Sequence, residues 1–231
     1  MNVVTRISSV VLALGLVASP AAAQLLNDPV YINPNMGTGL SIAGDIGYGV
    51  NNASGKNSSF NGRVTLGLPM VQFTVGGGMF HQKAVGAAPS VNTANFMGQA
   101  ALKVLGSTPM MPVNVAIFAG AGYASKSGLK TTTVPAGVAI GLKLPSPGVS
   151  VEPWIAPRIN YLHTSVSTGG VSASGSTTKF GISGGVNVDL PGGFGLQAAA
   201  DYLAISGGSP FLISGGLHYT FSVPGLGMAG M

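Results

Sequence analysis

The chain has 231 residues, of which 46% are hydrophobic and only 6% are charged, and it contains no cysteine. Soluble domains carry roughly 25% charged residues. This composition, with a mean hydropathy of +0.47, therefore argues against a soluble protein, and the lack of cysteine excludes disulfides. The formal net charge of +5 is scattered along the chain without a basic stripe, which argues against a nucleic acid partner.

The first 23 residues have the pattern of a secretory signal peptide. Arg6 supplies a short positive region, residues 7–18 are almost wholly apolar, and the alanines at residues 21–23 offer a small-residue cleavage site. The apolar run is shorter than the roughly 20 residues that a membrane-spanning helix needs. We therefore predict that residues 1–23 are removed on export, with an uncleaved membrane anchor as the alternative.

Residues 24–38 have no clear period and contain two prolines, so we expect a periplasmic lead-in. The segments that follow alternate between apolar and polar or small residues, as a strand with two different faces does. In the first of them Ile42 and Ile46 share one face, whereas Ser41 and Asp45 share the other. We predict ten strands of this kind, over residues 39–50, 59–68, 71–83, 95–105, 112–124, 132–143, 149–166, 177–189, 193–205 and 210–222.

The connections between these strands alternate in kind. One set is short and rich in proline and glycine, at residues 67–70, 107–112, 144–148 and 190–193. The other set is polar or small and generally longer, at residues 51–59, 84–95, 125–131, 163–178 and 206–209. Short periplasmic turns and longer external loops are typical of outer-membrane barrels. The pattern predicts that both ends of the strand region lie in the periplasm, and hence an even number of strands.

Glycine, proline or asparagine interrupts every long apolar run after the signal segment, so we find no candidate for a transmembrane helix. The other architecture that pairs all backbone groups within lipid is a closed β-barrel. We therefore predict an all-β fold, a closed antiparallel up-and-down transmembrane β-barrel. It occupies residues 39–222 and is followed by a short C-terminal extension, residues 223–231.

Three prolines fit this prediction poorly, because proline cannot donate a hydrogen bond to a strand ladder. Pro135, Pro153 and Pro157 all lie within predicted strands. We expect the seventh strand either to bulge at its prolines or to start only near Arg158.

Apart from Lys83, which lies beside a predicted external loop, the charged residues within the predicted strands share one face. They are Asp45, Arg63, Lys103, Lys143, Glu152, Arg158, Lys179, Asp189 and Asp201. An Arg or Lys on the lipid face costs roughly 2–4 kcal/mol at mid-membrane, so we assign this face to the barrel interior. The near balance of acids and bases favours ion pairs in a narrow, mostly filled lumen. An anion-preferring pore lined by the bases is the alternative.

Four segments together resemble bacterial outer-membrane β-barrel proteins of the OmpA-like or porin-family type. They are Ala-Gly-Ala-Gly-Tyr at residues 119–123, Glu-Pro-Trp-Ile-Ala at 152–156, Gly-Gly-Val-Asn-Val-Asp-Leu at 184–190 and Gly-Leu-His-Tyr-Thr-Phe at 216–221. The resemblance implies a location in the outer membrane, contact with its lipids and insertion by the barrel-assembly machinery. The terminal strand with Leu217, Tyr219 and Phe221 resembles the signal that this machinery reads. Many small family members have eight strands, which is the alternative to our ten.

The sequence offers little for catalysis. His163 and Ser165 lie two apart, on one face of a strand, and resemble the His-x-Ser of outer-membrane lipid A deacylases, but no acid occurs between Glu152 and Asp189. We read His218 as a hydrogen-bonded lumen residue, and no spacing suggests a metal site. We therefore expect no catalytic, metal or cofactor site and a structural or surface-interaction role. A passive small-solute channel and, less favoured, a lipid-modifying enzyme are the alternatives.

Overall fold

The computed structural model describes residues 31–35, 37–51, 55–83, 90–108, 110–168, 171–204 and 211–222. These residues form strands and one short 3-10 turn, η1 (Pro191–Gly193). The strands are β1 (Gly39–Asn51), β2 (Gly55–Gly67), β3 (Val71–Gln82), β4 (Val91–Leu105), β5 (Val113–Lys126), β6 (Leu129–Leu142), β7 (Leu144–Ser146), β8 (Val149–Thr168), β9 (Val171–Asp189), β10 (Phe194–Leu203) and β11 (Phe211–Phe221). Within this part of the chain, no helix is long and apolar enough to cross a membrane.

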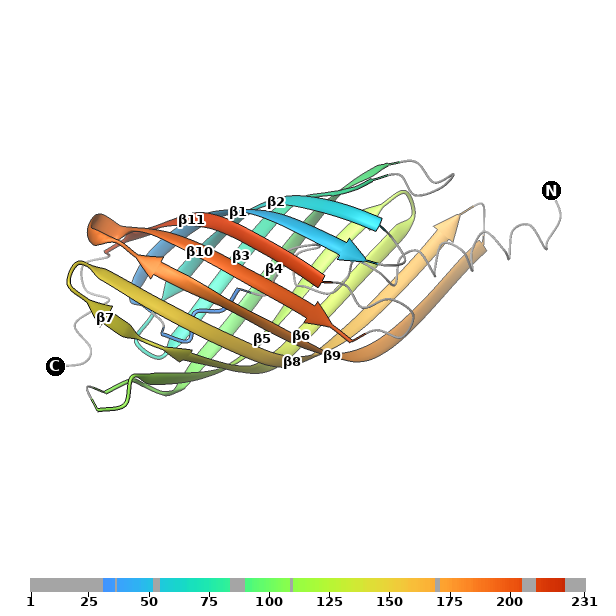
Figure 1. Ribbon diagram of the computed structural model, residues 1–231. Coiled ribbons are helices and arrows are strands. Elements are labelled where there is room, and N and C mark those ends of the chain that lie inside the picture. The colour runs from blue at the N-terminus through green and yellow to red at the C-terminus, as the bar shows by residue number, and fades with distance from the viewer. Residues whose placement is uncertain are drawn as a thin grey trace.

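Ten long strands of the described residues form a closed antiparallel barrel (Figure 1). Neighbours in the chain are neighbours in the sheet, and β1 pairs with β11 from Leu40 opposite Phe221 to Val50 opposite Phe211. The three-residue β7 continues the line of β6 and pairs with β8. The prediction of a closed barrel of about ten strands is confirmed, and the alternative of eight strands is wrong.

The barrel has two different ends. β1 begins and β11 ends on the left in Figure 1, which we call the terminal end. At the opposite end, the hairpin end, β8 and β9 continue to a pair between Thr168 and Val171. We expected a long loop over residues 163–178, and this was wrong. The backbone ladder runs without a break almost to the tip, where the Ser172 hydroxyl also donates to the Ser167 hydroxyl at 3.2 Å.

The strand prolines are accommodated by gaps in the ladders. Between β5 and β6 the pairing skips Val134 and Pro135, and between β6 and β8 it skips Ala156 and Pro157. Proline has no N–H to donate, so a local gap is the expected response. The seventh long strand, β8, begins at Val149 rather than near Arg158.

Side chains alternate between a crowded interior and an exposed exterior along most of the barrel, whereas residues 174–178 of β9 are exposed on both faces. Along β4, for example, Thr93, Asn95 and Met97 are buried and the residues between them are exposed. The exterior is apolar: Ile46 and Phe60 each expose 67% of their surface. An apolar outer surface on a closed barrel is the form that fits a bilayer.

A charge placed on this exterior should destabilise the protein according to its depth. Ile46 lies near the middle of β1, so Ile46→Arg should lower the free energy of unfolding by about 2–4 kcal/mol, measured by urea unfolding in lipid vesicles. Leu66→Arg, at the terminal end of β2, is the matched control and should cost roughly 0–1 kcal/mol. Equal losses for the two variants would contradict the lipid-facing assignment of Ile46.

Candidate functional site: the barrel interior

A buried ion pair connects β8 and β10 over the inner face of β9, which lies between them. Arg158 Nη2 lies 2.8 Å from Asp201 Oδ1, and both side chains are fully buried. Ser183 links the two, because it accepts from Arg158 Nη1 at 2.5 Å and donates to Asp201 Oδ1 at 2.7 Å. Arg158 Nε donates to Asn160 Oδ1 at 3.1 Å. Pairing and additional hydrogen bonds are what buried charges require.

A second ion pair lies on β1 and β2. Arg63 donates to Asp45 Oδ2 from Nε at 2.9 Å and from Nη2 at 2.8 Å, and the Gln197 amide donates to Asp45 Oδ1. The guanidinium carbon of Arg63 lies 4.0 Å from the centre of the Tyr31 ring, a geometry that favours a cation–π interaction. This pair therefore ties the barrel wall to a residue that precedes the first strand.

Tyr31 belongs to a segment, residues 31–35, that lies inside the barrel. Tyr31 and Ile32 are buried in one apolar cluster with Trp154. The Tyr31 hydroxyl donates to Ser214 Oγ at 2.9 Å, and its backbone carbonyl accepts from Gln99 at 3.3 Å. We expected residues 24–38 to form a periplasmic lead-in, but the described residues 31–35 pack against the inner wall instead.

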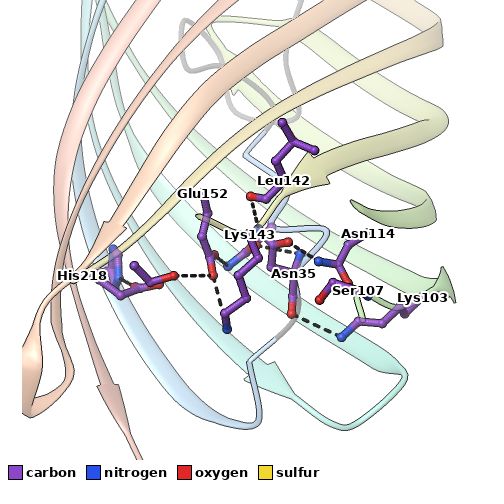
Figure 2. Close-up of polar contacts among 11 residues, drawn as sticks. Asn35, Lys103, Ser107, Asn114, Leu142, Lys143, Glu152 and His218 are labelled. Carbon is purple, nitrogen blue, oxygen red and sulfur yellow. Dashed lines mark hydrogen bonds and ion pairs between the residues drawn. The ribbon is translucent and has the colours of Figure 1, made fainter. Parts of the chain in front are cut away.

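Two asparagines hold the rest of this segment at the terminal end (Figure 2). Asn33 donates to Glu152 Oε2 at 3.2 Å. The Asn35 side chain accepts from Asn114, and its backbone carbonyl accepts from Lys103 Nζ at 3.2 Å. These contacts reach β4, β5 and β8, so the segment bridges strands on different sides of the lumen.

The terminal end holds two more charge contacts and a cavity. Lys143 Nζ lies 3.6 Å from Glu152 Oε1, with the lysine side chain 49% exposed. His218 Nε2 lies 2.8 Å from Asp189 Oδ1. Beside these pairs and residues 31–35 is a cavity of about 240 Å³. A cavity of this size admits a few waters or a very small solute.

Glycines on the inner wall make room for the long polar side chains. A methyl group at Gly137 would lie 2.7 Å from Arg158 Cβ, and one at Gly76 would lie 2.8 Å from Arg63 Cγ. At Gly181 it would lie 2.8 Å from Asn160 Nδ2. Such distances are shorter than side-chain packing allows, so only glycine leaves room at these positions for the long side chains of the neighbouring strand.

The hairpin half of the interior is lined by apolar side chains and amides. Phe80, Ala124 and Leu162 form a buried apolar cluster there. Several buried polar atoms of the described residues have no protein partner, namely Asn57 Oδ1, Asn61 Oδ1, Asn95 Nδ2 and Oδ1, Gln99 Oε1, Trp154 Nε1 and Asn160 Nδ2. Buried polar groups of this kind bind ordered water.

The structure places the predicted lumen charges as follows. The buried ones are Asp45, Arg63, Glu152, Arg158 and Asp201, and the partly buried ones are Lys103, Lys179 and Asp189. Lys143 is exposed beside Glu152. The sequence reasoning missed Tyr31, Ile32, Asn33 and Asn35. Their one signal was an apolar pair followed by asparagines in a segment without a period.

The outer face of β11 carries the predicted assembly residues. Leu217 is 65% exposed, and the Tyr219 ring packs edge-on against Phe221 with 4.6 Å between ring centres. Phe194 packs on the other side of Tyr219 at 4.7 Å. The three residues share one face of the strand, as their spacing predicts.

No hydrogen bond joins the two residues of the candidate catalytic pair. His163 Nδ1 lies 2.8 Å from Ser176 Oγ, on β9. The described residues contain no group of three His, Cys, Asp or Glu side chains that would hold a metal ion.

Breaking one partner of the Arg158–Asp201 pair should destabilise the barrel more than removing both. Asp201→Leu leaves a buried guanidinium without its carboxylate and should lower the free energy of unfolding by about 3–5 kcal/mol. Arg158→Met combined with Asp201→Leu removes both charges and should recover part of that loss. Urea unfolding in vesicles measures the free energy of unfolding of the double variant and of each single variant, Arg158→Met and Asp201→Leu. A loss in the double variant equal to the sum of the two single losses would contradict a coupled pair.

Comparisons with known proteins give the family. Residues 9–222 match the family model of the outer membrane protein beta-barrel domain. No curated protein matches the sequence significantly.

Several solved structures match this chain at low sequence identity. Neisserial surface protein A is 15% identical, with a TM-score of 0.45, over 80% of this chain and 98% of that one. The beta domain of the Bordetella autotransporter BrkA is 13% identical, with a TM-score of 0.48, over 80% and 100%. The N-terminal barrel of Pseudomonas aeruginosa OprF is 12% identical, with a TM-score of 0.38, over 78% and 97%. The family model is what assigns the chain: it belongs to the outer membrane protein β-barrel family and is a protein of the bacterial outer membrane.

Proposed function

We propose that this protein is an integral outer-membrane barrel with a structural or surface-interaction role and a closed lumen. One observation carries the proposal: ion pairs, amides and residues 31–35 occupy the interior at successive levels between the two ends. Arg158 and Asp201 are fully buried, and Arg63 is held between Asp45 and Tyr31. Small barrels of this width are commonly filled by their own side chains.

A passive channel for small solutes is the second candidate. It is favoured by the cavity of about 240 Å³ at the terminal end and by the buried amides that can bind water. Against it stand the apolar cluster of Phe80, Ala124 and Leu162 at the other end and the fully buried pair of Arg158 and Asp201. A lipid-modifying enzyme is less favoured, because His163 is hydrogen-bonded to Ser176 and no acid occurs between Glu152 and Asp189.

Export and insertion complete the proposal. We propose that residues 1–23 are removed after export and that Leu217, Tyr219 and Phe221 on the outer face of β11 are read by the barrel-assembly machinery. In support, these three side chains share the exposed face of the strand that closes the barrel.

Conductance distinguishes the two leading functions. The purified protein, shown to be folded by a heat-dependent shift on a gel, should give no unitary current steps in a planar bilayer, because no open path joins the two ends. A general porin, prepared in the same detergent, is the positive control. Reproducible steps from the folded protein would favour the channel and overturn the closed lumen.

Replacing the last aromatic residue should impair assembly. Phe221→Ala removes an exposed ring that packs on Tyr219, and we expect a lower fraction of heat-modifiable protein in the outer membrane at equal expression. Ile213→Ala, on the same face of β11 but near its other end, is the matched control. If both variants assemble as well as the unmodified chain, Phe221 is not part of the signal.

A further inference from the structure

One edge of the β8–β9 hairpin lacks a neighbouring strand. β9 pairs with β8 along its whole length, but its pairing with β10 ends at Gly181, opposite Leu203. One more backbone bond follows, from the Ala204 N–H to the Phe180 carbonyl at 2.9 Å. Beyond it, residues 171–179 have no partner on this side among the described residues, and the hairpin projects from the barrel in Figure 1.

The opposite edge of the hairpin is covered. β6 pairs with β8 as far as Val166, and the Ser167 N–H donates to the Gly128 carbonyl at 2.9 Å. The free edge is therefore confined to β9. Residues 205–210, which connect Ala204 to β11, are too few to lie along all of residues 171–179, because the chain must return to Phe211 opposite Tyr202.

The backbone groups that face this edge follow from the ladder. The Phe180 carbonyl points toward β10. In an antiparallel ladder the backbone N–H and C=O groups of every second residue point to the same side, so those of the even-numbered residues before Phe180 point the same way. Their N–H and C=O groups lie along the free edge, at Ser172, Ser174, Ser176 and Thr178. The backbone N–H and C=O groups of the odd-numbered residues point toward β8.

This edge has none of the usual protection against strand addition. Exposed edge strands commonly carry charges, prolines or bulges that prevent pairing. Residues 171–178 contain no charge and no proline, and the one charge of the unpaired stretch is Lys179 at its barrel end. The register of these residues with β8 is regular. The edge is thus ready to accept a strand.

We propose that the free edge of β9 binds an extended polypeptide segment of a partner protein, which adds to the barrel sheet as a further strand. A polypeptide is the partner because its backbone supplies alternating donors and acceptors at the spacing of a strand. The lack of charge along the edge means that backbone bonds, rather than ion pairs, provide the affinity. The inference rests on the surface-interaction role proposed above.

A second copy in the same membrane does not fit this edge. Two barrels related by an axis along the membrane normal have β9 strands that run in the same direction. Identical backbone groups then face each other, so that N–H opposes N–H. The occupant is therefore a segment of a different protein.

A proline at an edge-facing position tests the proposal. Ser174→Pro removes an N–H that points away from β8, so the hairpin keeps its own ladder, and Ser174→Ala is the matched control. The probe is a fluorescent peptide with the sequence of residues 160–168, the part of β8 that already pairs with this stretch of β9. Fluorescence anisotropy measures its binding to the full-length protein in detergent, and a heat-shift gel checks that each variant is folded.

We expect saturable binding of the peptide that is about tenfold weaker for Ser174→Pro and unchanged for Ser174→Ala. Equal binding by the proline variant, or no saturable binding up to about 1 mM peptide, would overturn the proposal. A protein dimer that is lost in Ser174→Pro would assign the edge to a second copy and also overturn it. Peptide binding is measured independently of conductance. A negative result in the peptide assay would therefore overturn the edge-binding proposal without contradicting the closed lumen, which the conductance measurement tests.

Discussion

The structure depends on closure of its sheet by the ladder between β1 and β11. In lipid an unpaired backbone N–H or C=O costs several kcal/mol, so an open sheet edge within the membrane would be prohibitive. The pairing from Leu40 with Phe221 to Val50 with Phe211 removes that edge. Once the sheet is closed, each strand has one face toward lipid and one toward a narrow lumen, and this division dictates where charge can lie.

The same division explains why the interior is crowded. Ionised side chains are excluded from the outer face, and within the lumen they need partners because little water reaches them. Arg158 with Asp201 and Arg63 with Asp45 meet that need. Glycine on facing strands supplies the space, as Gly137 does beside Arg158. The barrel therefore neutralises its own buried charges by ion pairs between nearby strands of its inner wall.

Much of this architecture was predictable from the sequence, because lipid and lumen impose different residue types on alternate positions. The inward position of Asp45 beside the outward Ile46 follows directly from that contrast. The contrast disappears where both faces are polar, so the strands around Ser165 and Ser174 looked like a loop. Residues 31–35 have no period at all, and their position depends on the shape of a lumen formed by strands distant in the chain. Packing of that kind produces no local pattern in the sequence from which the position of residues 31–35 could be predicted.

Cross-linking of β1 to β11 tests the closed barrel most directly. The chain has no cysteine of its own, so a pair of introduced cysteines reports on one contact alone. Ser41 lies opposite Thr220, and Ser41→Cys with Thr220→Cys should form a disulfide within one molecule in the outer membrane. Ser41→Cys with Phe221→Cys places the second thiol on the other face of β11 and should not. No cross-link in the first variant, or equal cross-linking in both, would contradict a sheet closed in this register.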